Sequence, residues 1–226
     1  MGGIINMYKP KSDCQIKNLA EIYEKYFGYR STGFFVEVGG YDGDSFSNTA
    51  FLADLGWKGV YVEPIPQHCM LCQKRHEGND VKVVNVAVGL EEGITPIYYG
   101  AALTTLDKNQ AQRYSEMDWA KHIHFSETYC EQQKLSTVLE NQNVPKDFDI
   151  LVVDVEGKEE EVFKTFSLDE WNPKMLIVEI EDEHPSFQKY PEVIQSFKSL
   201  RAYIKSKGYV EVQRDMINTI YIKEEV

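Results

Sequence analysis

VEVGGYDGDSFSNT, residues 36–49, sets the architecture expected for this chain of 226 residues. The apolar run at 34–38 predicts a short strand, and a helix is expected from Ser45 to Leu55 after a glycine-rich turn. Gly39 and Gly43 let a ligand approach the backbone closely, and the unpaired N–H groups of a helix start would face the same place. This order predicts a ligand-binding turn at the carboxyl end of a strand.

The same alternation of strand and helix continues outward from this turn. Strands are expected at 34–38, 59–63, 81–88, 149–154 and 175–180, with an antiparallel pair at 208–213 and 217–222. Helices are expected at about 13–28, 45–55, 66–75, 135–142, 158–166 and 190–206. The pattern predicts an α/β fold with a mainly parallel sheet of seven strands, helices on both faces and an antiparallel C-terminal strand.

One stretch interrupts the pattern. Residues 94–99 indicate a short additional strand, and the apolar periodicity then breaks down between about 100 and 133. We interpret this stretch as an insertion or lid over the site, within a single domain that covers residues 1–226.

An adenosine-containing cofactor is indicated by Glu63, which ends the second strand 24 positions after Gly39. An acidic residue at about that distance suits the two hydroxyls of a ribose. The glycines do not follow the dinucleotide spacing G-x-G-x-x-G, because Tyr41 and Asp44 occupy the later positions, and Asp42 and Asp44 would repel a pyrophosphate. The pattern favours S-adenosylmethionine; NAD, or a turn shaped only by packing, are the alternatives.

Acidic residues gather where the fourth and fifth long strands end. Asp154 ends one strand, and Glu179 and Asp182 come at or after the end of its expected neighbour. A general base that takes a proton from a substrate hydroxyl could be any of Asp154, Glu156, Glu179 and His184. Alternatively, Asp154, Glu179 and Asp182 could hold Mg²⁺ or Mn²⁺, which prefer oxygen ligands. Glu181 and Glu183 are expected to be solvated surface charges.

Several spaced motifs are similar to those of the FkbM-type methyltransferases. They are E-V-G-G-Y-D-G from Glu37, S-x-S-N-T from Ser45, V-E-P-x-P from Val62 and D-V-E-G-x-E-x-E-V from Asp154, within a resemblance that spans about residues 13–222. The resemblance implies a Rossmann-like class I fold and S-adenosylmethionine-dependent O-methylation, mostly of sugars and secondary metabolites.

The resemblance also implies which residues bind the cofactor. Those that match are Glu37, Gly39, Gly40, Tyr41, Asp42, Gly43, Ser47, Asn48, Glu63, Pro64, Asn85, Val86, Ala87 and Asp154. Glu37, Gly39 and Gly43 would contact the methionine part, Glu63 the ribose, and 85–87 would border the adenine.

Composition narrows the possible partners. The formal net charge is −12, which disfavours nucleic acid as the main partner. No run of apolar residues is long enough to span a membrane, and no signal-peptide pattern opens the chain, so a cytoplasmic protein with free thiols is expected. His68, Cys69, Cys72 and His76 lie within nine positions, but one helix cannot wrap four ligands around zinc, so we expect the thiols to pack against the sheet.

We therefore expect methyl transfer to a hydroxyl of a sugar or glycan. A small phenolic or polyketide acceptor is the alternative within the same chemistry. A methyltransferase-like protein that only binds its ligand is the alternative outside it.

Overall fold

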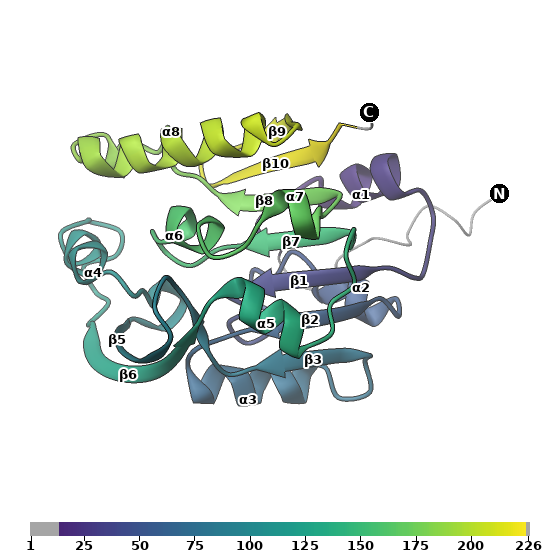
Figure 1. Cartoon of the computed structure of the whole chain (residues 1–226). Helices are drawn as coiled ribbons and strands as arrows, with labels where there is room; N and C mark the ends of the chain where they lie inside the picture. Colours follow the sequence, from purple (N-terminus) through teal and green to yellow (C-terminus); the bar gives the residue numbers. More distant parts are fainter. Residues whose placement is uncertain (1–13, 225–226) are drawn as a thin grey trace.

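The computed structural model describes residues 14–224. Its main sheet has seven strands in the order β3-β2-β1-β7-β8-β10-β9 (Figure 1). β10 is antiparallel to the other six strands. The strands are β1 Phe34–Val38, β2 Lys58–Val62, β3 Val81–Val84, β7 Ile150–Val153, β8 Met175–Glu179, β9 Tyr209–Arg214 and β10 Asn218–Lys223. The predicted Rossmann-like α/β fold with an antiparallel C-terminal strand is confirmed.

Helices cover both faces of this sheet, as predicted (Figure 1). Val36, Val38, Leu151 and Val153 share one apolar cluster with α5 Leu135–Asn141, α6 Glu159–Phe163, α7 Leu168–Trp171 and α8 Pro191–Ser206. The intervening strand residues, such as Phe35 and Val152, share a second cluster with α1 Leu19–Phe27, α2 Ala50–Asp54 and Cys72 of α3 Pro66–Arg75. Alternate side chains of each central strand thus pack on different helix layers, which is why these strands are mainly apolar.

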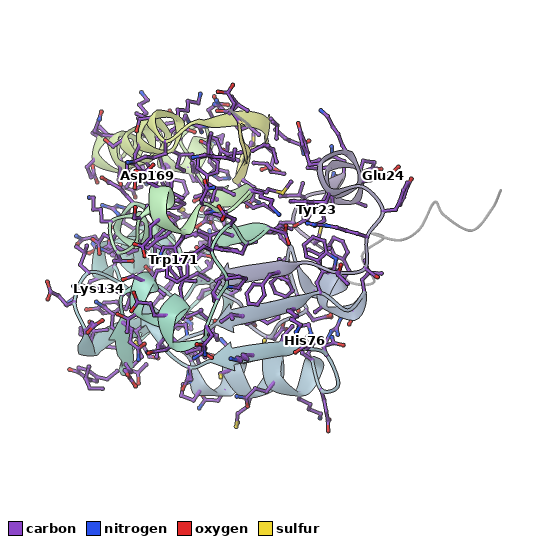
Figure 2. The ribbon with its side chains drawn as sticks, turned by 45° about the vertical axis from the view of Figure 1, so that its right-hand side comes forward. Tyr23, Glu24, His76, Lys134, Asp169 and Trp171 are labelled. Carbon is purple, nitrogen blue, oxygen red and sulfur yellow. The ribbon has the colours of Figure 1, made fainter. Side chains whose placement is uncertain are left out.

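The first helix is shorter than expected. α1 begins at Leu19, and residue 13, where the helix was expected to begin, lies outside the described residues. Residues 14–18 run beside the loop after β1, where Cys14 forms an isolated parallel bridge with Phe46. Tyr23 is fully buried and donates its hydroxyl to the Asn48 carbonyl, while Glu24 points away from the sheet (Figure 2). α1 therefore packs on the loop that follows β1 as well as on the sheet.

The predicted single strand 81–88 is wrong. β3 ends at Val84, and Ala87–Val88 form β4 in a separate sheet ordered β4-β6-β5, with β5 Gly93–Tyr99 and β6 Ser126–Gln133. The polar composition of β6 hides its strand character, because only Cys130 and Gln132 of its residues are buried. The stretch 100–133 also holds the 3₁₀ turn η1 Ala101–Leu103 and α4 Lys108–Ser115.

The second helix starts later than Ser45. α2 begins at Ala50, because Ser47 and Thr49 bind the Glu37 carboxylate instead of continuing a helix.

α7 and the 3₁₀ turn η2 Pro185–Phe187 were not expected from the sequence. No helix among residues 14–224 combines the length and the apolar character that crossing a membrane requires.

Candidate functional site

The site lies where the order of strands reverses. β1 and β7 are parallel neighbours, yet the chain leaves β1 toward β2 and leaves β7 toward β8, which opens a crevice at their carboxyl ends. The loops touch at the two residues that follow these strands: Asp154 donates its backbone N–H to the Val38 carbonyl at 3.0 Å, and a Cβ on Gly39 would lie 1.7 Å from the Asp154 carbonyl oxygen. With a φ of +91°, only glycine suits position 39.

Two predicted cofactor residues shape the loop after β1. The Asp42 carboxylate accepts the backbone N–H groups of Asp44 at 2.9 Å and Ser45 at 2.7 Å. Gly43 has a φ of +75°, and a Cβ there would lie 2.6 Å from the Cys72 sulfur. Asp42 and Gly43 do not line the cleft, so their place in the structure is that of loop-forming residues.

Glu37 anchors the loop to the strand. Its buried carboxylate accepts the Ser47 hydroxyl at 2.9 Å, the Thr49 hydroxyl and the Asn48 N–H at 3.3 Å. Burial raises the pKa of Glu37 to about 7, against the opposing effect of these hydrogen bonds. Glu37 therefore holds the S-N-T turn in place.

Glu63 stands at the end of β2, opposite the loop. Its carboxylate accepts the backbone N–H groups of Tyr41 at 3.0 Å and Ile65 at 2.8 Å, and the His68 ring approaches it at 3.5 Å. Asn85 donates its side-chain amide to the Glu63 carbonyl at 2.9 Å. Asn85 thus supports Glu63 rather than lining the cleft.

Most of the predicted cofactor residues line one cleft. These are Glu37, Gly39, Gly40, Tyr41, Ser47, Asn48, Glu63, Pro64, Val86, Ala87 and Asp154. Four residues of the predicted lid, Ala101, Ala102, Thr104 and Leu106, form part of the same wall.

Gln15 and Phe46 are among the lining residues that sequence reasoning missed. Gln15 donates its side-chain amide to the Asp154 carboxylate at 3.2 Å and accepts the Asn218 amide at 3.0 Å. Phe46 has a φ of +63° and is 53% exposed at the cleft. No pattern marks Gln15, whose partner Asp154 lies 139 residues further along the chain, whereas Phe46 lies inside the S-F-S-N-T motif.

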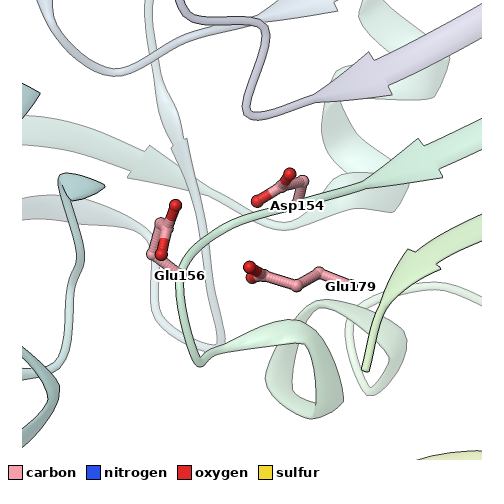
Figure 3. A group of neighbouring side chains, drawn as sticks. All are labelled: Asp154, Glu156 and Glu179. Carbon is pink, nitrogen blue, oxygen red and sulfur yellow. The ribbon is translucent and has the colours of Figure 1, made fainter. Parts of the chain in front are cut away.

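Three acids converge beside this cleft. One carboxylate oxygen each of Asp154, Glu156 and Glu179 lies within 4.8 Å of the others, and Figure 3 shows the side chains turned toward one another. Asp154 and Glu156 also line the cleft, while Glu179 is only 5% exposed. We call these three residues the acid cluster; two of its members were predicted as metal ligands and all three as candidate bases.

Further acids surround the acid cluster. Glu159 is buried and accepts the N–H groups of Val155 at 3.0 Å and Gly157 at 3.1 Å. Glu181 is 7% exposed, so the prediction that it is a solvated surface charge is wrong. Burial raises the pKa of Glu181 to about 8, and burial is also the main cause of the raised pKa of each acid-cluster carboxyl.

The structure does not bring Asp182 or His184 into the cleft. Asp182 forms an ion pair with Arg201 at 2.8 Å, and Glu156 takes its place beside Asp154 and Glu179. His184 accepts the Ser186 N–H at 3.3 Å, and its ring lies 6.5 Å from that of Trp119. Burial lowers the pKa of His184. Asp182 and His184 therefore follow Glu179 in the chain but do not line the cleft.

Cys72 of α3 packs against the sheet, as expected of the thiols. Cys72 is fully buried, and the His76 ring stacks on Tyr61 with centroids 4.7 Å apart. His76 also contacts the Gly43 carbonyl at 2.8 Å. Cys69, Cys72 and Cys130 form no disulfide within the described part of the chain. Cys72 and His76 thus pack against Gly43 in the loop after β1.

Comparisons with known proteins agree with this geometry. The model of the methyltransferase FkbM domain matches residues 37–211. The structure resembles an O-methyltransferase from Bacillus cereus (12% identity, TM-score 0.53) and a putative O-methyltransferase from Klebsiella pneumoniae (11% identity, TM-score 0.52). Each likeness covers 95% of this chain and 84% of the other, and at such identity it shows the fold alone. No curated protein sequence gives a significant match. Because the family model covers most of the chain, this protein belongs to the FkbM methyltransferases, as its motifs predicted.

Proposed function

We propose that this protein transfers a methyl group from S-adenosylmethionine to a hydroxyl of a sugar or glycan. When bound, S-adenosylmethionine supplies an electrophilic methyl group on a sulfonium sulfur. The single observation that carries the proposal is the cleft at the β1–β7 crevice, where Gly39 meets Asp154 and Glu63 faces the loop from β2. The Bacillus cereus O-methyltransferase that shares the fold was solved in complex with SAH, which supports the same ligand here.

The residues of the cleft suit an adenosine ligand. The Glu63 carboxylate keeps lone pairs beyond its two backbone contacts, and these can accept ribose hydroxyls. Val86, Ala87 and Ile97 are buried apolar neighbours on the other wall and suit a flat adenine ring. Polar groups at one end and an apolar wall at the other would orient the ligand.

The acid cluster would act as the base that accepts the proton of the acceptor hydroxyl. Burial raises the pKa of Asp154 and Glu156, which makes their carboxylates stronger bases than exposed ones. The same carboxylates offer oxygen ligands to Mg²⁺ or Mn²⁺. A divalent ion is therefore part of the proposal.

The cleft walls favour a neutral acceptor. No Lys or Arg occurs among the described residues that line it, and the net charge of the chain is −12. A phosphorylated acceptor would find no counter-charge there, whereas the hydroxyls of a sugar can donate to carboxylates. The rings of Tyr41 and Phe46 at the cleft favour a phenolic acceptor as the second candidate.

Calorimetric titration with S-adenosylhomocysteine tests the cofactor. Wild-type protein should bind it with micromolar affinity, and Glu63→Ala should weaken binding by at least about tenfold, which corresponds to about 1.4 kcal/mol. Glu77→Ala removes the same charge from an exposed position outside the cleft and should bind like the wild type. No binding by folded wild-type protein would refute the proposed cofactor.

Mass spectrometry of acceptor mixtures tests the reaction. Methyl rhamnoside and other simple glycosides should gain one methyl group, and catechol should react more slowly. Faster reaction of catechol would favour the phenolic alternative. Binding of S-adenosylhomocysteine without methylation of any hydroxyl would favour a protein that only binds its ligand.

A further inference from the structure

The geometry of the acid cluster matches a small divalent ion. One oxygen each of Asp154, Glu156 and Glu179 lies within 4.8 Å of the other two. An octahedral Mg²⁺ with ligands at about 2.0–2.1 Å holds its oxygens about 3–4 Å apart, so small side-chain adjustments bring all three into range. The ligands come from the ends of two adjacent strands, which fixes their backbones (Figure 3).

Glu179 gives a second and independent indication of a ligand. Its side chain is directed at Asp154 and Glu156, and only 5% of the residue is exposed (Figure 3). Its Oε2 has no hydrogen-bond partner among the described residues. A buried polar oxygen without a partner is costly, and most such oxygens in folded proteins are satisfied. A cation bound between the three side chains would satisfy this oxygen.

The surrounding residues provide no counter-charge. Among residues 14–224, no Lys or Arg forms an ion pair with the acid cluster: Lys158 is paired with Glu161, and Arg201 with Asp182. The neutral donors to the cluster are the Gln15 amide and the Tyr114 hydroxyl. The neighbouring acids Glu159 and Glu181 supply no positive charge either.

We propose that Asp154, Glu156 and Glu179 bind one divalent cation, Mg²⁺ or Mn²⁺. Three carboxylates favour these ions over softer metals, and three protein ligands leave coordination positions for water or acceptor hydroxyls. The ion reaches the site through the cleft, which Asp154 and Glu156 line. Its chemical role rests on the proposed methyl transfer: it would hold neighbouring hydroxyls of a sugar and lower the pKa of the one that is methylated. Its binding does not depend on that reaction.

Titration of EDTA-treated protein with Mn²⁺, followed by the EPR signal of free Mn²⁺, tests the site directly. We expect one saturable site per chain with micromolar affinity, from which Mg²⁺ displaces Mn²⁺. Glu179→Gln and Asp154→Asn keep the side-chain shapes and should each weaken Mn²⁺ binding by about tenfold or more. Glu183→Gln removes one negative charge from an exposed residue of the neighbouring segment and should bind Mn²⁺ like the wild type.

Two results would overturn the site. Folded wild-type protein that takes up no Mn²⁺ would show that the acid cluster is held by shared protons. Equal Mn²⁺ binding by wild type, Glu179→Gln and Asp154→Asn would place any bound ion elsewhere. Circular dichroism and urea unfolding confirm that each variant is folded.

A separate titration distinguishes this site from the proposed cofactor. S-adenosylhomocysteine is added to the EDTA-treated wild-type protein and to the Mn²⁺-loaded protein. Mn²⁺ binding without S-adenosylhomocysteine binding would refute the cofactor and leave the metal site standing. The opposite result would refute the metal site and leave the cofactor standing.

Discussion

Gly39 is the residue at which the loops after β1 and β7 come closest. Gly39→Ala would place a Cβ 1.7 Å from the Asp154 carbonyl oxygen, so the two loops must separate. We expect this variant to lose S-adenosylhomocysteine binding and at least about 3 kcal/mol of unfolding free energy in urea, since overpacking and backbone strain add.

Gly78 provides a matched control for this substitution. Its φ of +93° equals that of Gly39 within two degrees, but a Cβ there would meet no atom within 4 Å. Gly78→Ala should therefore show only the backbone cost, on the order of 1–2 kcal/mol, with ligand binding unchanged. Equal effects of the two substitutions would contradict the close approach of the loops.

Glu37 should make stability depend on pH in an unusual direction. Its pKa is about 7 in the folded protein against an ordinary value of 4.5, so the folded state binds the proton more tightly. Its contribution is most favourable below pH 4.5 and is lost as the pH rises to about 7. The shift corresponds to roughly 3 kcal/mol.

Urea unfolding between pH 5 and pH 8 measures this effect. Relative to wild type, Glu37→Gln should gain about 2–3 kcal/mol of unfolding free energy on going from pH 5 to pH 8, because the variant has no carboxyl to deprotonate. Glu77→Gln, at an exposed position, should track the wild type across this range. Parallel curves for Glu37→Gln and wild type would show that Glu37 is already ionised at pH 5.

At the scale of elements, one hydroxyl joins the 100–133 segment to the D-V-E-G loop. Thr105 is 1% exposed, donates its hydroxyl to the Glu156 carbonyl at 2.7 Å and accepts the Asp107 N–H at 3.0 Å. Thr105→Val should cost about 1–3 kcal/mol and weaken Mn²⁺ binding, because the Glu156 backbone loses its tether. Thr128→Val, on an exposed position of β6, should leave both quantities unchanged. Unaltered Mn²⁺ affinity in Thr105→Val would show that the loop is positioned without this bond.

The elements also show what the sequence could and could not predict. Mainly apolar runs such as 34–38 and 175–179, each with one glutamate, correctly predicted buried parallel strands, and Gly39, Glu63 and Asp154 follow from their positions at strand ends. β6 was missed because its residues are mostly polar and its partners β4 and β5 are distant in sequence. Glu159 and Gln15 were missed for a different reason, since long-range contacts decide which polar side chains are buried.

For the whole molecule, Arg201 connects the last helix to the C-terminal strands. Its guanidinium binds Asp182 and Glu211, both at 2.8 Å, and contacts the Tyr221 hydroxyl at 3.2 Å. Arg201→Gln should lower the unfolding free energy by roughly 3 kcal/mol, because it leaves largely buried carboxylates without a counter-charge. The loss should be seen as a lower urea midpoint.

Lys205 is the comparison for Arg201. It approaches the same Glu211 at 3.3 Å, but half of its side chain is exposed. Lys205→Gln should cost less than about 1 kcal/mol. A similar loss from both substitutions would show that burial does not strengthen the Arg201 interactions.

The two-sided burial of the central strands also limits how the chain can change in length. Leu151 and Val153 of β7 face one helix layer and Ile150 and Val152 the other. Deleting one residue there would exchange the two sets and rotate Asp154 away from the crevice. We expect viable length variants of this protein to have their insertions and deletions between strands, above all in the β5–β6 connection. In a deletion scan of the gene, the loss of three bases inside β7 should not be tolerated, whereas the loss of three bases in the β5–β6 connection should be tolerated.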